Sequence, residues 1–238
     1  MTAATSLTIV TGGSSGIGAR IAARAGDDGH DVIVVSRSPG DFGRHVPADL
    51  SVPEGWDVFA ALADHEVPGR SRVEFFHCAG TIDPIGFAGE VEPGGYRTQV
   101  VLNGAAPQIL GDALLRALAG AGVEAMLVFL TSGAARTVYP GWSAYCAGKA
   151  AVDHWVRTVG AEQAERRGAR VLAIAPGVVA TPMQERIRGT DARDFPKVER
   201  FRSLVRDGEL GDPDDVARRL RLVAPRLANG SVVDLRDL

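Results

Sequence analysis

The amino-acid sequence predicts an α/β fold: a three-layer, doubly wound parallel sheet in a single domain. Short runs rich in β-branched residues alternate with longer amphipathic stretches along the whole chain, an order typical of parallel strands joined by crossover helices. A glycine-rich segment joins the first run to the first stretch, as in sheets that bind a ligand at the carboxyl ends of their strands. The chain has 238 residues and no linker-like composition change, internal repeat or low-complexity segment. We therefore expect one domain over residues 1–238.

The expected strands and helices alternate regularly. About seven strands are expected, of which a short third one precedes Asp49 and the others cover residues 7–11, 31–35, 73–77, 126–131, 170–175 and 232–235. The expected helices cover residues 16–28, 54–66, 98–121 and 144–167. Right-handed crossovers would place helices on both faces of the sheet and leave a ligand crevice where the chain reverses direction across it.

Residues 181–211 have a less regular pattern. They carry many charges and a Phe195-Pro196 pair, without clean helical or strand periodicity. We expect this segment to be a substrate-covering loop with a short helix rather than a second domain.

Composition and charge exclude several classes of protein. The net charge is −3, from 26 basic and 29 acidic residues, and no run of five or six like charges occurs, which disfavours binding to nucleic acid or to an anionic membrane. The first apolar stretch, residues 7–10, is too short for a signal peptide or a membrane span. Cys78 and Cys146 have neither metal-ligand spacing nor a disulfide framework, so we expect no metal and a reducing compartment, the cytoplasm.

The glycine-rich segment is the first feature that points to chemistry. Residues 11–18 read TGGSSGIG, directly after an expected strand and at the start of an expected helix. Glycine allows a positive φ and a close approach of the backbone to a pyrophosphate, while the free amides and dipole of the helix attract anions. An ordinary structural turn is the alternative, because short glycine patterns recur by chance. The predicted nucleotide contacts are Gly12, Ser14, Ser15, Gly16, Ile17 and Gly18.

The end of the second expected strand indicates which nucleotide is bound. An NAD site usually has an acidic residue there, which holds the ribose 2′-hydroxyl, but this chain has Ser36 and Arg37. A guanidinium and a hydroxyl suit a 2′-phosphate, which a carboxylate would repel. We therefore predict NADP (NADPH) in preference to NAD, with a merely solvated Arg37 as the alternative. Asp49 and Leu50, after the third strand, are weaker candidates for contacts to the adenine.

A serine, a tyrosine and a lysine form the second chemical pattern. Ser132 follows the apolar run at 126–131, and Tyr145 and Lys149 lie four residues apart on an expected helix. That spacing puts the phenol and the ammonium on one face, where the ammonium can stabilise the phenolate and bring a tyrosine pKa near 10 toward neutrality. Taken alone, the pair is equally compatible with an ordinary surface tyrosine and lysine.

Together these features resemble the short-chain dehydrogenase/reductase superfamily, and the resemblance covers essentially the whole chain. The glycine motif, the set of Ser132, Tyr145 and Lys149, and the run PGVVAT at 176–181 fall in the order that the family keeps. The resemblance implies a Rossmann-type fold, hydride transfer with a nicotinamide cofactor that Tyr145 and Lys149 also contact, and pairing of the two long helices in a homodimer or homotetramer. It further implies that Asn103 kinks a helix and holds a water of a proton relay. The residues implied to hold the nicotinamide half are Pro176, Gly177, Val179 and Thr181.

One departure from the family pattern follows the fourth expected strand. The family usually has Asn-Asn-Ala-Gly there, and this chain has His77-Cys78-Ala79-Gly80. The pair Ala79 and Gly80 keeps room for the cofactor ribose. Cys78 is expected to be a small buried residue beside the cofactor rather than a reactive thiol, and His77 a structural histidine.

Within the superfamily, several stretches resemble the sepiapterin reductase and benzil reductase group, namely residues 79–86, 141–146, 195–196 and 233–237. This resemblance implies NADPH-dependent reduction of a ketone or diketone, with Ser132 and Tyr145 on the carbonyl oxygen, Tyr145 as proton donor and Lys149 as its cationic neighbour. Asp234 matches an aspartate that holds the pterin in sepiapterin reductases, with a polar strand end as an equal alternative. Candidates for an apolar substrate wall are Trp142, Tyr139, Phe87, Met183 and Phe195.

Two other functions stay open at the level of sequence. The same residues would serve a metabolic NADP-dependent alcohol dehydrogenase, because cofactor ratio and substrate supply set the direction of the reaction. A non-catalytic NADP(H)-binding regulator could keep the fold without turnover, although the intact Ser132, Tyr145 and Lys149 set argues against it.

Overall fold

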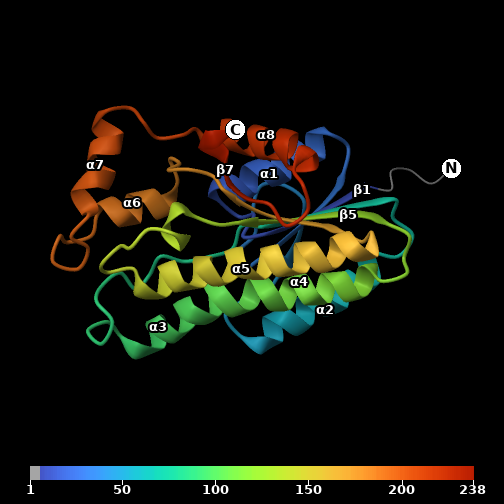
Figure 1. Cartoon of the computed structure of the whole chain (residues 1–238), viewed down its shortest axis with the longest axis horizontal. Coiled ribbons are helices and arrows are strands. Elements are labelled where there is room, and N and C mark those ends of the chain that lie inside the picture. The colour runs from blue at the N-terminus through green and yellow to red at the C-terminus, as the bar shows by residue number, and fades with distance from the viewer. Residues whose placement is uncertain (1–5) are drawn as a thin grey trace.

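The computed structural model describes residues 6–238 and is built on one parallel sheet of seven strands (Figure 1). Their spatial order is β3-β2-β1-β4-β5-β6-β7, and every neighbouring pair is parallel. The predicted doubly wound sheet is thereby confirmed. The strands are β1 (Ser6–Thr11), β2 (Asp31–Ser36), β3 (Arg44–Pro47), β4 (Arg72–His77), β5 (Glu124–Leu130), β6 (Arg170–Ala175) and β7 (Val232–Asp234).

Helices cover both faces of the sheet. Figure 1 shows α1 and α8 on one side and α2, α4 and α5 on the other, while α6 and α7 form a lobe beyond one end of the strands. The helices are α1 (Gly16–Asp27), α2 (Pro53–Glu66), α3 (Pro93–Val100), α4 (Ala106–Leu118), α5 (Ser143–Arg166), α6 (Pro182–Arg188), α7 (Val198–Arg206) and α8 (Pro213–Val223). No helix among residues 6–238 is long and apolar enough to cross a bilayer.

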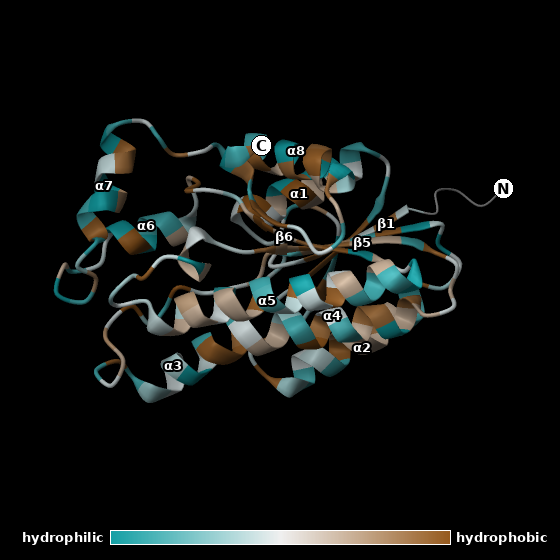
Figure 2. Cartoon of the chain, viewed as in Figure 1, coloured by the Kyte–Doolittle hydropathy of each residue, from teal (hydrophilic) through white to brown (hydrophobic). Residues whose placement is uncertain are grey.

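Side chains that alternate along the strands pack into two hydrophobic cores, one on each face of the sheet. In β1, Leu7 and Ile9 pack with the helices α2, α4 and α5, whereas Val10 faces the core that includes α1 and α8. In β5, Phe129 and Val128 divide between the same two cores. Successive side chains of a strand point to opposite faces, so a sheet covered on both faces has apolar residues at most positions of its central strands. Figure 2 shows this as nearly continuous hydrophobic colouring of the central strands.

The segment expected to be one helix over 98–121 consists of two helices joined by a π-helical turn. The first helix begins at Pro93, where the Glu92 carboxylate accepts hydrogen bonds from the next two free amides, as helix caps do. The π-helical turn, Val101–Ala105, contains Asn103. The amide of Asn103 bonds both backbone groups of Thr81, a tertiary contact that the sequence pattern does not display.

Two further helical regions differ from expectation. Residues 181–211 contain two helices, α6 and α7, rather than one. Helix α8 was not expected, because only Val216, Ala217 and Leu220 are buried among its many charged residues. Its start is nevertheless well defined, since the Asp212 side chain accepts hydrogen bonds from two backbone amides of the first turn.

A buried histidine ends β4. His77 is 2% exposed, its Nδ1 hydrogen-bonds with Thr11 Oγ1 at 2.9 Å, and its ring lies against those of Phe75 and Phe129. Its Nε2 has no hydrogen-bond partner among the residues that the structure describes. Burial lowers the pKa of His77 to about 3, and the charge of Lys149 acts in the same direction. The imidazole is therefore neutral in the folded protein at ordinary pH.

We predict that His77 makes the protein acid-labile. In the unfolded chain a histidine takes up a proton near pH 6.5, whereas the folded protein resists this down to about pH 3. The unfolded state thus binds more protons between these values, and stability is lost as pH falls from about 6.5, by up to about 1.4 kcal/mol per pH unit. His77→Asn, which keeps a polar partner for Thr11, should flatten this loss in urea unfolding measured from pH 7 to pH 5.

The matched control is His65→Asn, which changes a side chain that is 84% exposed and should leave the acid dependence as in the wild type. Equal slopes of unfolding free energy against pH for His77→Asn and the wild type would contradict the prediction.

Candidate active site

Two adjoining cavities lie at the carboxyl ends of the strands. The first, here called the glycine-loop cleft, has a volume of about 500 Å³. Almost all predicted cofactor contacts line it: Gly12, Ser14, Ser15, Gly16, Ile17, Gly18, Ser36, Arg37, Asp49, Leu50, Cys78, Ala79, Gly80, Tyr145, Lys149, Pro176 and Thr181. Residues from five strand ends are thus brought to one cleft, as expected at the point where strand order reverses.

The glycine loop is tightly packed. Gly12 has a φ of +68°, and a Cβ atom there would lie 2.7 Å from the backbone nitrogen of Ala79. A Cβ atom on Gly18 would lie 2.5 Å from the Gly12 carbonyl oxygen. Ser15 caps α1 in an extended conformation, and its side chain takes no cap hydrogen bond from the described backbone. The first amides of this twelve-residue helix are therefore open to an anion, which fits the pyrophosphate of a dinucleotide.

The end of β2 offers a cation to the same cleft. The Arg37 side chain is exposed there. The Ser36 hydroxyl donates to the Ser38 carbonyl at 2.7 Å, so it can still accept a hydrogen bond but its proton is already used. The Asp49 carboxylate accepts two hydrogen bonds from Ser51, which lower its pKa.

The second cavity, here called the aromatic cavity, has a volume of about 160 Å³. Its lining includes Ser132, Tyr139, Trp142, Tyr145, Met183, Ile187 and Phe201. Tyr145 lines both cavities and is one of seven residues that they share, with Ile17, Ile82, Thr131, Pro176, Thr181 and Met183.

Tyr145 and Ser132 form the polar centre of this junction. Ser132 follows β5 and caps the short 3₁₀ turn Gly133–Ala135, with its hydroxyl oxygen accepting from the Ala134 amide at 3.1 Å. Burial raises the pKa of Tyr145 to about 12, and interaction with the Ser132 side chain acts to lower it. The expectation that Lys149 brings this pKa toward neutrality is therefore wrong for these side chains, because desolvation dominates.

Lys149 lies one turn further along α5 and is almost completely buried. Its Nζ donates to the Leu130 carbonyl at 2.8 Å and lies 5.8 Å from the centre of the Tyr145 ring. Burial lowers the pKa of Lys149 to about 8, while Cys78 and the Asp153 carboxylate act to raise it. An ammonium that titrates near neutral pH beside a phenol is an arrangement suited to proton transfer.

The Asn103 side chain is bonded to the backbone of the segment that follows β4. Its side-chain oxygen accepts from the Thr81 amide at 3.0 Å, and its Nδ2 donates to the Thr81 carbonyl at 2.7 Å. A Cβ atom on Gly148 would lie 2.8 Å from Cβ of Asn103, so the π-helical turn packs directly on α5. The side-chain amide is thus occupied in holding the segment after β4.

Several predicted residues lie elsewhere. Gly177 and Val179 line the aromatic cavity rather than the glycine-loop cleft. Phe195 is fully buried and stacks on Trp142 with ring centres 4.3 Å apart, behind the cavity wall. Phe87 lines a separate surface hollow. Asp234 does not line the aromatic cavity, and its carboxylate instead accepts two hydrogen bonds from the Arg236 side chain, which does.

Sequence reasoning missed four charged residues of these cavities. Arg200 and Arg236 line the aromatic cavity. Arg186 and Asp83 line the glycine-loop cleft and form an ion pair at 2.8 Å across its edge. These residues come from segments far apart in sequence, and no motif joins them.

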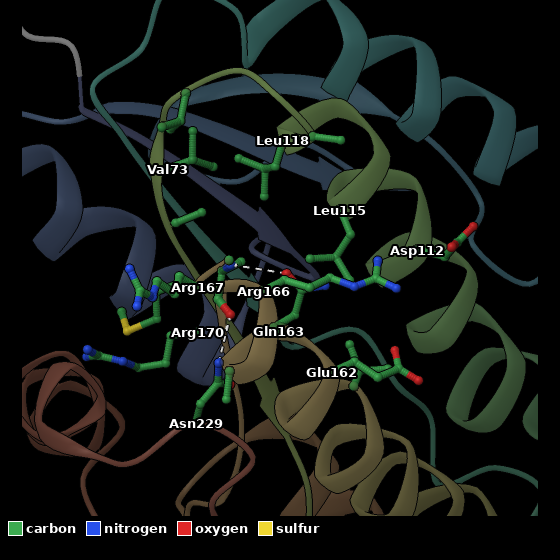
Figure 3. A pocket seen from close by; sticks show the side chains of 18 of the residues that line it. Val73, Asp112, Leu115, Leu118, Glu162, Gln163, Arg166, Arg167, Arg170 and Asn229 are labelled. Carbon is green, nitrogen blue, oxygen red and sulfur yellow. Dashed lines mark hydrogen bonds between the residues drawn. The ribbon is translucent and has the colours of Figure 1, made fainter.

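A larger hollow, of about 1460 Å³, lies at the opposite, amino ends of the strands (Figure 3). Its labelled side chains come mainly from α4, α5 and the starts of β4 and β6, and include Asp112, Leu115, Glu162, Arg166 and Arg170. None of the predicted catalytic or cofactor-binding residues lines it. Among residues 6–238, no group of three His, Cys, Asp or Glu side chains could hold a metal ion.

The comparisons with known proteins agree with this geometry. The family model described as short chain dehydrogenase matches residues 6–192. A benzil reductase ((S)-benzoin forming) of Bacillus subtilis is 34% identical over 239 residues, covering 97% of this chain and 98% of that protein. A sepiapterin reductase of Bos taurus is 30% identical over 199 residues, covering 81% of this chain and 73% of that protein.

Among solved structures, a putative NAD(P)-dependent gluconate 5-dehydrogenase from Beutenbergia cavernae, with bound NADP at low occupancy, superposes with a TM-score of 0.80. It is 27% identical, and the match covers 98% of this chain and 95% of that one. The seven-stranded parallel sheet, the glycine loop and these matches together show that the chain belongs to the short-chain dehydrogenase/reductase family of oxidoreductases, which use NAD(P).

Proposed function

We propose that this protein reduces a ketone or 1,2-diketone to an alcohol, with NADPH as cofactor. The observation that carries the proposal is the position of Tyr145, whose side chain lines both the glycine-loop cleft and the aromatic cavity. A substrate carbonyl in the aromatic cavity would therefore meet a proton donor beside the cofactor cleft. Similarity along nearly the whole chain to a benzil reductase supports a carbonyl substrate with an apolar body.

The division of roles follows from the contacts. A bound NADPH supplies the hydride. Ser132 and Tyr145 would donate hydrogen bonds to the carbonyl oxygen, where negative charge develops. Tyr145, whose pKa of about 12 keeps it protonated, would then transfer its proton to that oxygen. The Lys149 ammonium would stabilise the resulting phenolate and hold the nicotinamide ribose. Because the side-chain amide of Asn103 is bonded to Thr81, the water that resupplies the proton would be held by the Asn103 backbone.

The preference for NADPH rests on Arg37. Its guanidinium is exposed at the edge of the glycine-loop cleft, close enough to Asp49 to lower the pKa of that carboxyl. A guanidinium at this place can bind a 2′-phosphate with paired hydrogen bonds. Ser36 adds no donor to the phosphate in this orientation, because its hydroxyl hydrogen is donated to the Ser38 carbonyl.

We also propose that the chain forms a homodimer or homotetramer through α4 and α5. The hollow of Figure 3 lies between these helices, with exposed Asp112 and Arg116 on one side and Glu162 and Arg166 on the other. A two-fold axis there would place the two charge pairs of each chain against their copies. Sedimentation equilibrium measures the resulting mass directly.

The first prediction from the proposed function tests the proton donor. Tyr145→Phe removes one oxygen and preserves the ring, so the fold and NADPH binding should survive, whereas turnover should fall by roughly two to four orders of magnitude because a general acid is lost. The measurement is NADPH consumption with a panel of diketones, quinones, pterins and β-ketoesters, with NADPH binding followed by fluorescence. Tyr96→Phe, which changes a tyrosine outside both cavities, is the control. Near-wild-type turnover of Tyr145→Phe would overturn the mechanism.

The second prediction concerns cofactor choice. Arg37→Asp replaces a phosphate ligand by a group that repels phosphate and accepts from a ribose hydroxyl, so kcat/KM with NADPH should fall by about two orders of magnitude while use of NADH improves. Arg20→Asp makes the same charge change on an exposed face of α1 outside the cleft and should alter neither value much. An unchanged NADPH/NADH ratio in Arg37→Asp would refute the assignment.

The third prediction is the pH dependence of reduction. Because the pKa of Lys149 is about 8, the ammonium is lost above that pH, and kcat/KM should be flat below pH 8 and fall above it. Asp153 acts to raise this pKa, so Asp153→Asn should move the alkaline limb to lower pH. Asp57→Asn, on an exposed site of α2, should not. A limb that stays in place in Asp153→Asn would show that Lys149 does not control it.

A further inference from the structure

The aromatic cavity has a cationic side. Arg200 from α7 and Arg236 from the 3₁₀ turn Leu235–Asp237 both line it, and its lining contains no aspartate or glutamate among the residues that the structure describes. The remaining wall is largely apolar, from Trp142, Met183 and Phe201 among others. A cavity of this kind has an apolar body and one charged end.

Arg236 is held in a defined orientation. Its Nε and Nη2 donate to the two carboxylate oxygens of Asp234 at 2.9 and 2.6 Å, and Asp234 is only 6% exposed. This paired contact uses two of the five N–H groups of the guanidinium. The side chain lies across Gly177, where a Cβ atom would be 3.2 Å from the Arg236 Cδ. The other side-chain donors have no hydrogen-bond partner among the described residues, and the side chain, which is 58% exposed, lines the cavity.

Arg200 adds a charge that no carboxylate offsets. Its Nη1 donates to the Tyr139 hydroxyl oxygen at 3.0 Å, and it has no ion-pair partner within residues 6–238. The pKa of Arg236 is raised mainly by its hydrogen bonds to Asp234, and Tyr139 acts in the same direction. Tyr139 is therefore near both guanidinium groups. Asp234 and Asp237 both act on the charge of Arg236, whereas the charge of Arg200 has no carboxylate partner among the described residues.

A third polar group lies in the same wall. Gln184 of α6 is 3% exposed and lines the aromatic cavity, and neither atom of its side-chain amide has a hydrogen-bond partner in the described part of the chain. A buried amide without partners is unfavourable. An anion bound in this cavity would offer it an acceptor.

We propose that the cavity selects ketones that carry a carboxylate, with Arg236 and Arg200 binding the carboxylate and Asp234 acting as the positioning residue of Arg236. The inference rests on the proposed carbonyl reduction and specifies its substrate class. A planar guanidinium fork matches the geometry of a carboxylate, and the small volume of about 160 Å³ suits a compact keto acid. A neutral diketone would fill the apolar wall but leave the Arg200 guanidinium without an anionic partner.

The test compares an acid with its own ester. The probes are 4-oxo-4-phenylbutanoate and its methyl ester, which share a carbon skeleton and differ in charge, and each is assayed for kcat and KM with NADPH and for binding by calorimetry. The wild type should prefer the acid, mainly through a lower KM. Arg236→Gln should lower the acid-to-ester ratio of kcat/KM about 10- to 100-fold, the value expected for losing a charge-assisted hydrogen bond.

Two variants separate a charge effect from a general loss of structure. Arg193→Gln makes the same change at a side chain that is 88% exposed and outside the cavity, and it should keep the wild-type ratio. Arg236→Lys keeps the charge without the fork and should keep part of the preference. Asp234→Asn should raise the KM of the acid more than it lowers kcat, because the guanidinium loses its orientation but not its charge.

The outcomes distinguish this proposal from the proposed function. If neither probe nor any neutral diketone is reduced, yet calorimetry shows Arg236-dependent binding of the acid over the ester, the carboxylate site stands and the reductase function fails. If ketones are reduced but the wild type does not prefer the acid in kcat/KM or in binding, the carboxylate site is overturned. An unchanged acid-to-ester ratio in Arg236→Gln also overturns it.

Discussion

The buried ammonium group of Lys149 is the constraint on which the rest of the site depends. A buried cation is unfavourable unless it has polar partners. The Lys149 ammonium donates a hydrogen bond to the Leu130 carbonyl at 2.8 Å and interacts electrostatically with the Asp153 carboxylate on the same helix. Burial still lowers the pKa of Lys149 to about 8. The same charge reaches the end of β4, where it acts to lower the pKa of His77 and of Cys78. Because burial raises the pKa of Cys78 to about 12, this thiol stays protonated, and no thiolate nucleophile forms there.

This arrangement also explains how a tyrosine with a high pKa can serve as a proton donor. Desolvation raises the pKa of Tyr145 to about 12, so the phenol keeps its proton until a stronger base appears. The alkoxide that hydride transfer creates is such a base. In the proposed reaction, the ammonium of Lys149, 5.8 Å from the ring, would then stabilise the phenolate that remains, and Ser132 would act in the same sense. The cationic neighbour would thus be needed after proton transfer rather than before it, whereas helical spacing alone predicts a lower pKa for the resting tyrosine.

Local sequence order was sufficient to predict the sheet and most of the glycine-loop cleft. The carboxyl ends of parallel strands lie at the same edge of the sheet, independently of the loop conformations. Four residues could therefore be assigned to one cleft from their positions after strands or on a crossover helix: Gly12, Arg37, Ala79 and Lys149. Features that depend on contacts between distant segments could not be predicted. The family resemblance implied a helix kink at Asn103, but the bonds to Thr81 that accompany its π-helical turn are a tertiary feature. The residues of α8 have a mostly charged surface, because only one narrow stripe of that helix packs on the core.

The two arginines of the aromatic cavity, Arg200 and Arg236, could not be predicted from the sequence. Asp234 was a candidate substrate contact because it matches a family position. In the structure, pairing of β6 with β7 places Asp234 opposite Ala175, and the turn that follows lies over Gly177. The side chain that reaches the cavity is therefore Arg236, and Asp234 orients it. The wall at this point combines the segment after β6, the helix α7 and the end of the chain, none of which carries Ser132, Tyr145 or Lys149. If the protein reduces ketones as proposed, substitutions in these three segments would alter which ketone enters while Ser132, Tyr145 and Lys149 stay in place, because substrate choice and proton transfer would then depend on different segments.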